Sequence, residues 1–283
     1  MRTIPCRAEL ALRGLLGCVV VATGAVACSS SQRDAGTATS ARADMVTVPA
    51  GWFVMGDDQG LPDARPAHRV YLDTFTIDRF EVSTAQYGTC VASGACPAPE
   101  RTSSETRQDY FGNKAFASYP VIGVTYADAV AFCNWRKARL PTEAEWEKAA
   151  RGTDQRIYPW GQQFDPSRLN YCDRSCDLPW RDTQHDDGYA DTSPVGAFPG
   201  GASPYGVLNM AGNVWEWVAD WYSANYYAHS PAHNPQGPAS GTQRITRGGG
   251  IFDDHVFTTS TMRRRFTPDV ASTSVGFRCA ATP

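Results

Sequence analysis

Short alternating stretches of hydrophobic and polar residues open the body of the chain. Residues 45–55 and 68–80 repeat apolar side chains at every second position, as at Val70 and Leu72. Successive side chains of a strand point to opposite faces, so this spacing predicts half-buried β-strands. Two further short strands are expected around residues 244–247 and 276–280.

Two segments carry the start signal of an α-helix. Thr142 precedes EAEWEKAARG and is followed three residues later by Glu145, which fits a capping box. Thr125 precedes YADAVAFCNWRKA and is followed by Asp128, a shorter acidic variant of the same signal. The side chains expected to pack inward are Ala129, Phe132 and Cys133 in the first helix and Ala144, Trp146 and Ala149 in the second.

After Gly152 the pattern becomes irregular. The chain has 25 glycines, 19 prolines and eight tryptophans, which predicts a loop-rich domain held by aromatic packing and cross-links. Its content of 42% apolar and 19% charged residues is typical of globular proteins. Residues 45–283 show no repeat and no second linker, and about 240 residues can form one domain. A net charge of −3 argues against nucleic acid as a partner.

The first residues read as an export signal rather than as part of the fold. Three arginines precede residues 15–27, an apolar run without charge that is too short to span a bilayer. This run ends in Ala25-Val26-Ala27, immediately before Cys28. Basic start, apolar run and small residues together predict a secretory signal peptide over residues 1–27.

The tripeptide before Cys28 resembles a bacterial lipobox, with alanine where leucine is commoner. This predicts that Cys28 becomes a lipidated N-terminus, and the alternative is ordinary signal cleavage near the same place. Ser29 resembles the outer-membrane sorting pattern, and residues 29–44 lack any large apolar side chain. We therefore expect an exported periplasmic lipoprotein whose residues 28–44 form a flexible tether to the lipid membrane, with the outer membrane as its location.

Cysteine counting supports export. Of nine cysteines, Cys6 and Cys18 lie in the signal and six lie in the body of the chain. An even number in an exported protein predicts three disulfides. Two cysteine pairs enclose short loops and are expected to form the bonds Cys90–Cys96 and Cys172–Cys176. The two cysteines that remain give the third expected bond, Cys133–Cys279. A zinc site is the alternative, although no cysteine pair has two-residue spacing.

The stretch NMAGNVWEW at residues 209–217 suggests a calcium site. Asn209 and Glu216 offer hard oxygen ligands, and the small residues between them allow backbone carbonyls to turn toward one point. A buried carboxylate between Trp215 and Trp217 would also be costly without a cation. The alternative is the start of an amphipathic helix with buried tryptophans.

Several motifs then occur in a specific order. They are VPAGWFVMG at 48–56, DRFEVSTAQY at 78–87, PVIGVTYADAVAFCNW at 120–135, RLPTEAEWEKAARG at 139–152, YPWG at 158–161, SPVGAFP at 193–199, NMAGNVWEW at 209–217, RGG at 247–249 and GFRCA at 276–280. Together they resemble the formylglycine-generating enzyme (sulfatase-modifying factor) family over residues 45–283. The resemblance implies an α+β fold: an irregular single domain, related to the C-type lectin fold, with low regular secondary structure.

The resemblance also implies two structural Ca2+ sites. One matches Asn170, Tyr171, Asp187 and Tyr189, and the other matches Asn209, Gly212, Val214 and Glu216. The alternative is that these side chains cap turns. Cys133–Cys279 matches a disulfide of the family, whereas a second family disulfide lacks both partners, with Ala150 at one position and no cysteine within 247–275.

The family's chemistry is where this sequence departs. Members oxidise a substrate cysteine in a sulfatase peptide to formylglycine with oxygen and copper(I), using two cysteines shortly after the RGG motif. Here those positions fall near Asp253 and Thr258, and no cysteine lies between Cys176 and Cys279. Copper(I) prefers soft thiolate ligands, which carboxylate and hydroxyl oxygens cannot replace. Copper and formylglycine-generating activity are therefore not expected.

The loop at Asp253, Asp254 and His255 has three possible uses. These residues could hold a harder metal, act as a general base and anchors in a cleft, or form a solvated acidic loop. The missing cysteines favour a pseudoenzyme, a binding or accessory module for a peptide, glycan or protein ligand. The alternative is an enzyme of the same family with noncanonical oxidase or protein-modifying chemistry.

Overall fold

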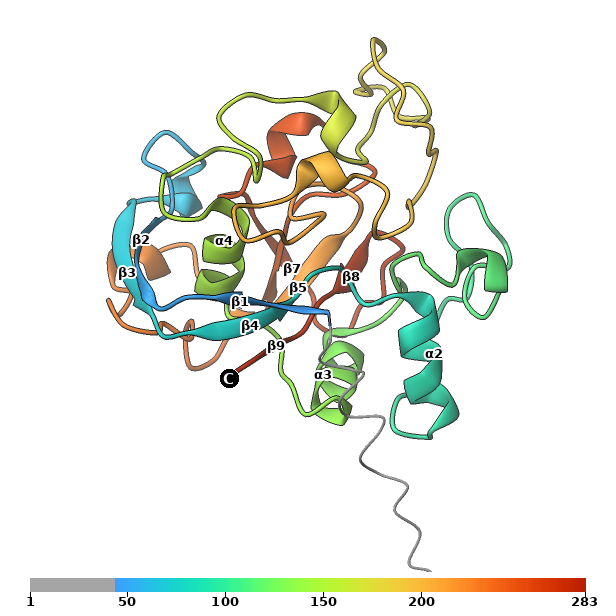
Figure 1. The fold of residues 1–283 in the computed structure, drawn as a ribbon, viewed down its shortest axis with the longest axis horizontal. Helices are drawn as coiled ribbons and strands as arrows, with labels where there is room; N and C mark the ends of the chain where they lie inside the picture. The colour runs from blue at the N-terminus through green and yellow to red at the C-terminus, as the bar shows by residue number, and fades with distance from the viewer. Residues whose placement is uncertain (1–43) are drawn as a thin grey trace, which may run out of the picture.

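The computed structural model describes residues 44–283, and the predicted signal peptide, Cys28 and residues 29–43 lie outside the described part. The predicted N-terminal strands are confirmed. β1 (Met45–Val48), β4 (Phe75–Asp78) and β9 (Ala280–Ala281) form one antiparallel sheet in the order β1-β4-β9, and β2 (Gly51–Met55) pairs with β3 (His68–Leu72). The C-terminus thus lies beside the first strands of the domain (Figure 1).

A second sheet has the order β7-β6-β5-β8, with β5 and β8 parallel and the other pairs antiparallel. Its strands are β5 (Trp215–Trp221), β6 (Arg244–Arg247), β7 (Arg263–Phe266) and β8 (Val275–Phe277). The helix alternative for residues 209–217 is therefore wrong. Strand alternation instead directs Trp215 and Trp217 into one core cluster, with Glu216 on the opposite face.

Within residues 44–283, three α-helices accompany the sheets: α2 (Thr84–Ala92), α3 (Tyr126–Trp135) and α4 (Glu143–Arg151). Both predicted capping boxes are present, at Thr125 and at Thr142. Helix α2 was not predicted, although Ser83 and Gln86 form the same type of box at its start. The 3-10 turns are η1 (Pro62–Ala64), η2 (Lys114–Phe116), η3 (Pro166–Arg168), η4 (Pro199–Gly201), η5 (Tyr226–Ala228) and η6 (His255–Thr258).

Helix α4 lies between the two-stranded sheet and the four-stranded sheet. It contacts β2 and β3 on one side and β5 and β6 on the other (Figure 1). Trp146 and Ala149 are buried as expected, but the charged residues of the helix are buried as well. Glu143 pairs with Arg247 and Arg263, which compensates a burial that would be costly for an isolated charge.

The three predicted disulfides are confirmed. Cys133–Cys279 joins residues 146 positions apart, whereas Cys90–Cys96 and Cys172–Cys176 close short loops. These bonds use all six body cysteines, so the zinc alternative is wrong.

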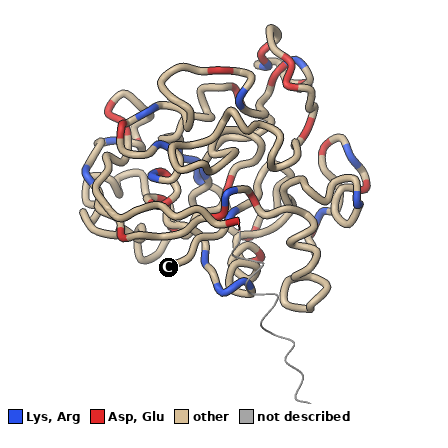
Figure 2. The backbone as a smooth tube through the Cα atoms, viewed as in Figure 1, with Lys and Arg blue, Asp and Glu red and all other residues tan. Residues whose placement is uncertain are grey.

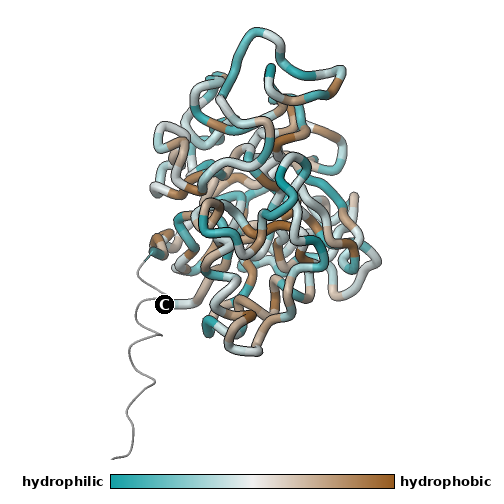
Figure 3. Tube along the Cα trace, turned by 90° about the vertical axis from the view of Figure 1, so that its right-hand side faces the viewer, coloured by the Kyte–Doolittle hydropathy of each residue, from teal (hydrophilic) through white to brown (hydrophobic). Residues whose placement is uncertain are grey.

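Hydrophobic segments run through the interior, and hydrophilic ones prevail in the projecting loops (Figure 3). The loop formed by residues 172–189, gold in Figure 1, carries several of the acidic positions marked in Figure 2. Within residues 44–283, no helix combines the length and hydropathy that a membrane crossing requires. The fold class is confirmed as an irregular α+β domain with small sheets.

Candidate functional site

The turn before β5 brings distant parts of the chain together. Asn209, Gly212 and Asn213 adopt φ values of 53°, 78° and 62°, a region that glycine and asparagine tolerate best. A Cβ at Gly212 would lie 2.2 Å from the carbonyl oxygen of Asn170, so only glycine permits this approach. The backbone N–H of Asn213 donates to that same carbonyl at 2.7 Å. The two predicted calcium groups are therefore neighbours.

Asp187 organises the first of these groups. Its carboxylate accepts hydrogen bonds from the backbone N–H groups of Tyr171 at 3.2 Å and Tyr189 at 2.8 Å. The backbone N–H of Asp187 in turn donates to the carboxylate of Asp173, a residue that sequence reasoning missed. Burial, reinforced by the negative charge of Asp173, raises the pKa of Asp187 to about 7. The buried carboxylate of Asp173 thus lies close to the half-buried carboxylate of Asp187.

Asn170 supplies a further oxygen to this group. Its side-chain nitrogen donates to the carbonyl of Asp191 at 3.0 Å, but its Oδ1 is buried without a hydrogen-bond partner. An unpaired buried oxygen is costly, and hard oxygen atoms of this kind are the ligands that calcium prefers. Asn170 and Asp187, with the carbonyls of Tyr171 and Tyr189, therefore fit a calcium ion, which would contribute charge and rigidity rather than reactivity.

The second group fits calcium less completely. Glu216 is fully buried, and its carboxylate accepts hydrogen bonds from Arg278 at 2.5 and 2.6 Å and from Trp146 Nε1 at 2.8 Å. A carboxylate offers about four acceptor positions, so one remains on this side chain. The side-chain Nδ2 of Asn209 donates a hydrogen bond to the carboxylate of Glu81. Burial raises the pKa of Glu81 to about 7. Arg278 already compensates part of the acidic charge that a cation would neutralise.

Calcium removal is expected to destabilise the domain. A ligand present at about 100 times its dissociation constant adds roughly 2.7 kcal/mol to stability. For a domain of this size we expect a fall in the melting temperature of roughly 5–10 °C on adding a calcium chelator. Fluorescence-monitored melting of wild type and Asn170→Ala, with exposed Asn225→Ala as the control, measures this. An unchanged wild-type midpoint would refute both sites.

The loop after β6 carries the positions that matter for redox chemistry. Asp253 directs its Oδ2 inward, where it accepts from Trp215 Nε1 at 2.6 Å and from Gly250 N at 3.0 Å. Burial raises the pKa of Asp253. A Cβ at Gly249 would lie 2.8 Å from the carbonyl oxygen of Phe257, so glycine is needed where the loop folds back on itself. Thr258 is fully buried and donates to the carbonyl of His255 at 2.8 Å.

The three adjacent polar residues of this loop do not converge. Asp253 faces Trp215, whereas Asp254 caps η6 through the N–H of Val256 at 3.4 Å and pairs with the ring of His255. No group of three or more His, Cys, Asp or Glu residues suited to a metal occurs within residues 44–283. The hypothesis of a harder metal at this loop therefore finds no support in the described part of the chain.

Aromatic residues that sequence reasoning missed surround the loop. Phe164 packs against the ring of His255 with centroids 4.7 Å apart, and Trp160 stacks on Tyr158 at 5.3 Å. Trp180 is 54% exposed and donates from Nε1 to the carbonyl of Phe252 at 2.9 Å. The YPWG motif at residues 158–161 was the sequence signal for two of these aromatic residues, Tyr158 and Trp160. The arrangement offers an aromatic-rimmed surface around an internally bonded aspartate.

Comparisons with known sequences find relatives along most of this chain. The sequence matches the sulfatase-modifying factor enzyme 1-like domain over residues 31–283. It is 37% identical to the formylglycine-generating enzyme of Thermomonospora curvata, in an alignment covering 84% of this chain and 93% of that protein. It is 32% identical to the mouse protein named inactive C-alpha-formylglycine-generating enzyme 2, covering 84% and 85%.

Solved structures give the same result. PvdO from Pseudomonas aeruginosa superposes with a TM-score of 0.69 at 28% identity, covering 83% of this chain and 93% of that one. Treponema denticola variable protein 1 superposes with a TM-score of 0.67 at 23% identity, covering 84% and 95%, which shows a shared fold. Sequence and fold together show that this chain belongs to the formylglycine-generating enzyme family, through its sulfatase-modifying factor enzyme 1-like domain.

Proposed function

We propose that this chain is a calcium-stabilised binding or accessory member of its family, without copper-dependent thiol oxidation. One observation carries the proposal. The two positions that the resemblance assigns to reactive cysteines fall near Asp253 and Thr258, and both side chains are engaged in hydrogen bonds within the protein. Copper(I) needs soft sulfur ligands, and every cysteine of the described residues is consumed in a disulfide. The likeness to a mouse relative named inactive is consistent with this proposal.

An oxidation assay tests the proposal directly. The purified chain is mixed with copper(I), oxygen and a cysteine-containing sulfatase peptide, and aldehyde formation is followed by mass spectrometry. We expect no aldehyde, whereas a relative with both cysteines, assayed in parallel, should convert the peptide. Aldehyde formation by this chain that Asp253→Asn abolishes would refute the proposal and favour noncanonical oxidase chemistry.

Restoring sulfur provides a matched gain-of-function test. Asp253→Cys combined with Thr258→Cys is expected to bind copper(I) in competition with a chromophoric chelator, because two thiolates then occupy the same loop. The single variant Thr258→Cys serves as the control and should bind copper(I) far more weakly. If wild type binds copper(I) as tightly as the double variant does, missing sulfur ligands are not what limits copper(I) binding at this loop.

The proposal includes export and lipid anchoring through Cys28. Cys28→Ala is expected to abolish incorporation of an alkyne-labelled fatty acid and to release the protein from the membrane fraction, because one site carries the anchor. The change Cys18→Ala, within the predicted signal, is the matched control and should leave both properties unchanged. Membrane fractionation that persists in Cys28→Ala would contradict the lipoprotein prediction.

A further inference from the structure

The loop from Arg174 to Ala190 has no hydrophobic core of its own. It projects from the body of the domain (Figure 1), and residues 169–198 contain no α-helix, 3-10 turn or strand. Within residues 174–190 the one buried side chain is that of Cys176. Segments with few buried apolar contacts open at a low cost in free energy. The disulfide from Cys176 to Cys172 therefore anchors a loop that packing alone does not hold.

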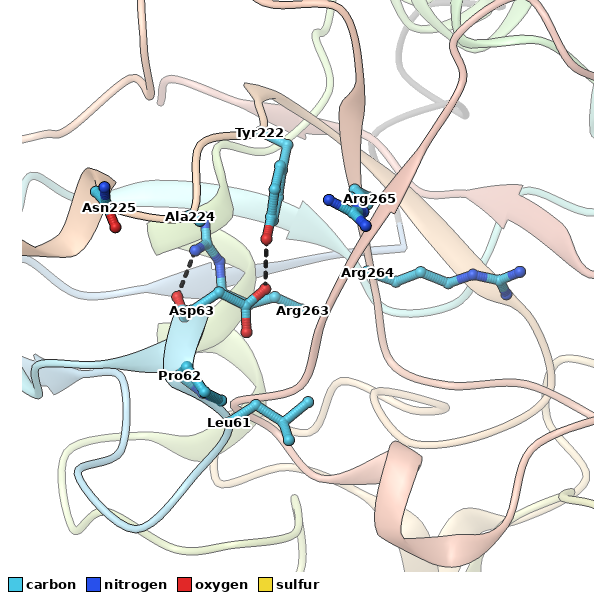
Figure 4. Close-up of a pocket in the computed structure, with 9 residues that line it drawn as sticks. All are labelled: Leu61, Pro62, Asp63, Tyr222, Ala224, Asn225, Arg263, Arg264 and Arg265. Carbon is cyan, nitrogen blue, oxygen red and sulfur yellow. Dashed lines mark hydrogen bonds between the residues drawn. The ribbon is translucent and has the colours of Figure 1, made fainter.

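The cavity at Arg263 is, by contrast, supported by several contacts at once (Figure 4). Tyr222 donates to Asp63 Oδ2 at 2.9 Å, and Arg263 donates to the carbonyl of Asp63 at 2.5 Å. Arg263 also donates to Glu143 at 3.0 Å. Loss of one of these contacts leaves the others in place. In the 174–190 loop a single bond holds the one buried side chain, so a single chemical event can release it.

Asp173 connects this disulfide to the first calcium group. It lies inside the short loop that the bond closes, where its Oδ1 accepts from Ser175 N at 2.9 Å and its carbonyl accepts from Cys176 N at 3.0 Å. Its other carboxylate oxygen accepts from the backbone N–H of Asp187, a predicted calcium ligand. The closed loop thus fixes the direction of the carboxylate that positions Asp187.

The other end of the disulfide is joined to the same group through the backbone. Tyr171, whose carbonyl is a predicted ligand, directly precedes Cys172. Cys172 is fully buried, its N–H donates to the carbonyl of Asp253 at 3.1 Å, and its carbonyl accepts from Asp182 N at 3.0 Å. The hydroxyl of Tyr171 donates to the carboxylate of Asp182 at 2.6 Å. Opening the bond therefore loosens both segments that carry the predicted ligands.

This bond, unlike the long one, reaches the surface. Cys176 is 7% exposed, whereas Cys133 and Cys279 are both 0% exposed. A thiolate must reach a sulfur atom to break a disulfide, so access favours attack at Cys176. Cys96 is 6% exposed as well, but its bond closes a loop at the end of α2 that contains none of the predicted calcium ligands. That bond is therefore a matched control.

We propose that the Cys172–Cys176 bond is a redox switch that sets the calcium affinity of the first group. A dithiol supplies the two electrons. Its thiolate attacks the sulfur of Cys176, Cys172 leaves as a thiolate, and the second thiol of the reductant then releases Cys176 and closes the reductant's own disulfide. The two thiol protons of the reductant end on the two cysteines. The oxidised chain binds Ca2+ tightly and the reduced chain binds it weakly. This inference rests on the calcium part of the proposed function.

The coupling has to act in both directions. If opening the bond weakens calcium binding, bound calcium makes the bond harder to reduce by the same factor, because the two equilibria are linked. Couplings between sites commonly amount to about 5–150-fold in affinity. Two routes join this bond to the ligands, one through Asp173 and one through Tyr171, so we expect a factor of roughly tenfold or more.

Isothermal titration calorimetry of calcium-depleted protein measures the effect of the bond on calcium. The variant Cys172→Ala with Cys176→Ala should bind Ca2+ roughly tenfold more weakly than oxidised wild type. The matched control, Cys90→Ala with Cys96→Ala, should bind like wild type. In Asn170→Ala, which lacks a ligand of the first group, opening the same bond should cause no further loss of affinity, because the site that it supports is already impaired.

Graded mixtures of reduced and oxidised dithiothreitol measure the effect of calcium on the bond. Alkylation and mass spectrometry of tryptic peptides follow reduction of the 172–176 bond in wild type. Calcium, compared with a chelator, should raise the ratio of reduced to oxidised dithiothreitol at half-reduction by roughly tenfold. In chelator, trypsin should cleave native protein after the exposed Arg174 and Arg181 faster in the reduced form than in the oxidised form.

The outcomes separate this inference from the proposed function. Equal calcium affinity in oxidised wild type and the open variant, or the same reduction midpoint with calcium and with chelator, would overturn the inference alone. Equal trypsin cleavage of the reduced and oxidised loop would do the same. If oxidised wild type binds no calcium, the calcium part of the proposed function falls and takes this inference with it. Aldehyde formation in the oxidation assay would overturn only the accessory function.

Discussion

Replacing Arg278 with methionine is expected to lower the free energy of unfolding by about 3–5 kcal/mol, because it breaks a buried ion pair by removing one partner. Arg278 is fully buried and donates twice to Glu216, while its Nη2 also reaches the carbonyl of Leu208 at 2.9 Å. Without the guanidinium, Glu216 and the nearby buried Glu81 keep their acidic groups in the core with no cation from the protein.

Urea denaturation followed by tryptophan fluorescence measures this loss. Arg168→Met is the matched control, because Arg168 pairs with Asp165 where both side chains are more than a third exposed, and it should cost less than about 1 kcal/mol. Arg278→Lys keeps a charge but not the planar set of donors, so we expect it to recover only part of the loss. Equal losses in the buried and exposed methionine variants would contradict this account of the core.

Removing the long disulfide is expected to cost more than removing a short one. Cys133→Ala with Cys279→Ala opens a link between residues 146 positions apart, whereas Cys172→Ala with Cys176→Ala opens one of 4. Loop-closure entropy predicts a loss of about 5 kcal/mol for the first pair and about 2 kcal/mol for the second. The long bond restricts the unfolded chain far more, since the two ends of a longer loop meet less often.

Both double alanine variants are compared with wild type by urea unfolding in the absence of reductant. Alanine avoids placing a hydroxyl group in the core, where Cys133 and Cys279 are fully buried. A loss for the short pair that matches or exceeds that of the long pair would show that native-state packing, rather than the unfolded chain, dominates the effect.

Local signals in the sequence predicted most of the regular elements. The boxes at Thr125 and Thr142 depend on residues three positions apart, and both are present. Strand β5 was harder to predict because Trp215, Glu216 and Trp217 fit either a helix start or a strand, and only the pairing with β6 and β8 decides. The burial of all of α4 was also unexpected, because the charges of Glu143 and Glu147 are compensated by Arg247, about 100 positions away.

In the candidate site too, the sequence identified residues, whereas their contacts follow only from the fold. Residue types near the RGG motif identified Asp253 and Thr258, but the hydrogen bond from Trp215 to Asp253 depends on the folded loop. The family pattern identified Asn170 and Asp187, whereas the role of Asp173 and the unpartnered oxygen of Asn170 follow from long-range packing. Motifs thus fix which groups are present, and tertiary contacts decide which of them remain available to a ligand.

The last strands of the domain have a consequence for how the protein is made. β8 completes the sheet around β5, β9 completes the sheet around β4, and Cys279 closes the long disulfide. A nascent chain in which residues 275–281 are still inside the ribosome lacks a strand in each of these two sheets. The core can therefore close only after these residues have been synthesised, so folding has to wait for them even though most of the domain precedes them.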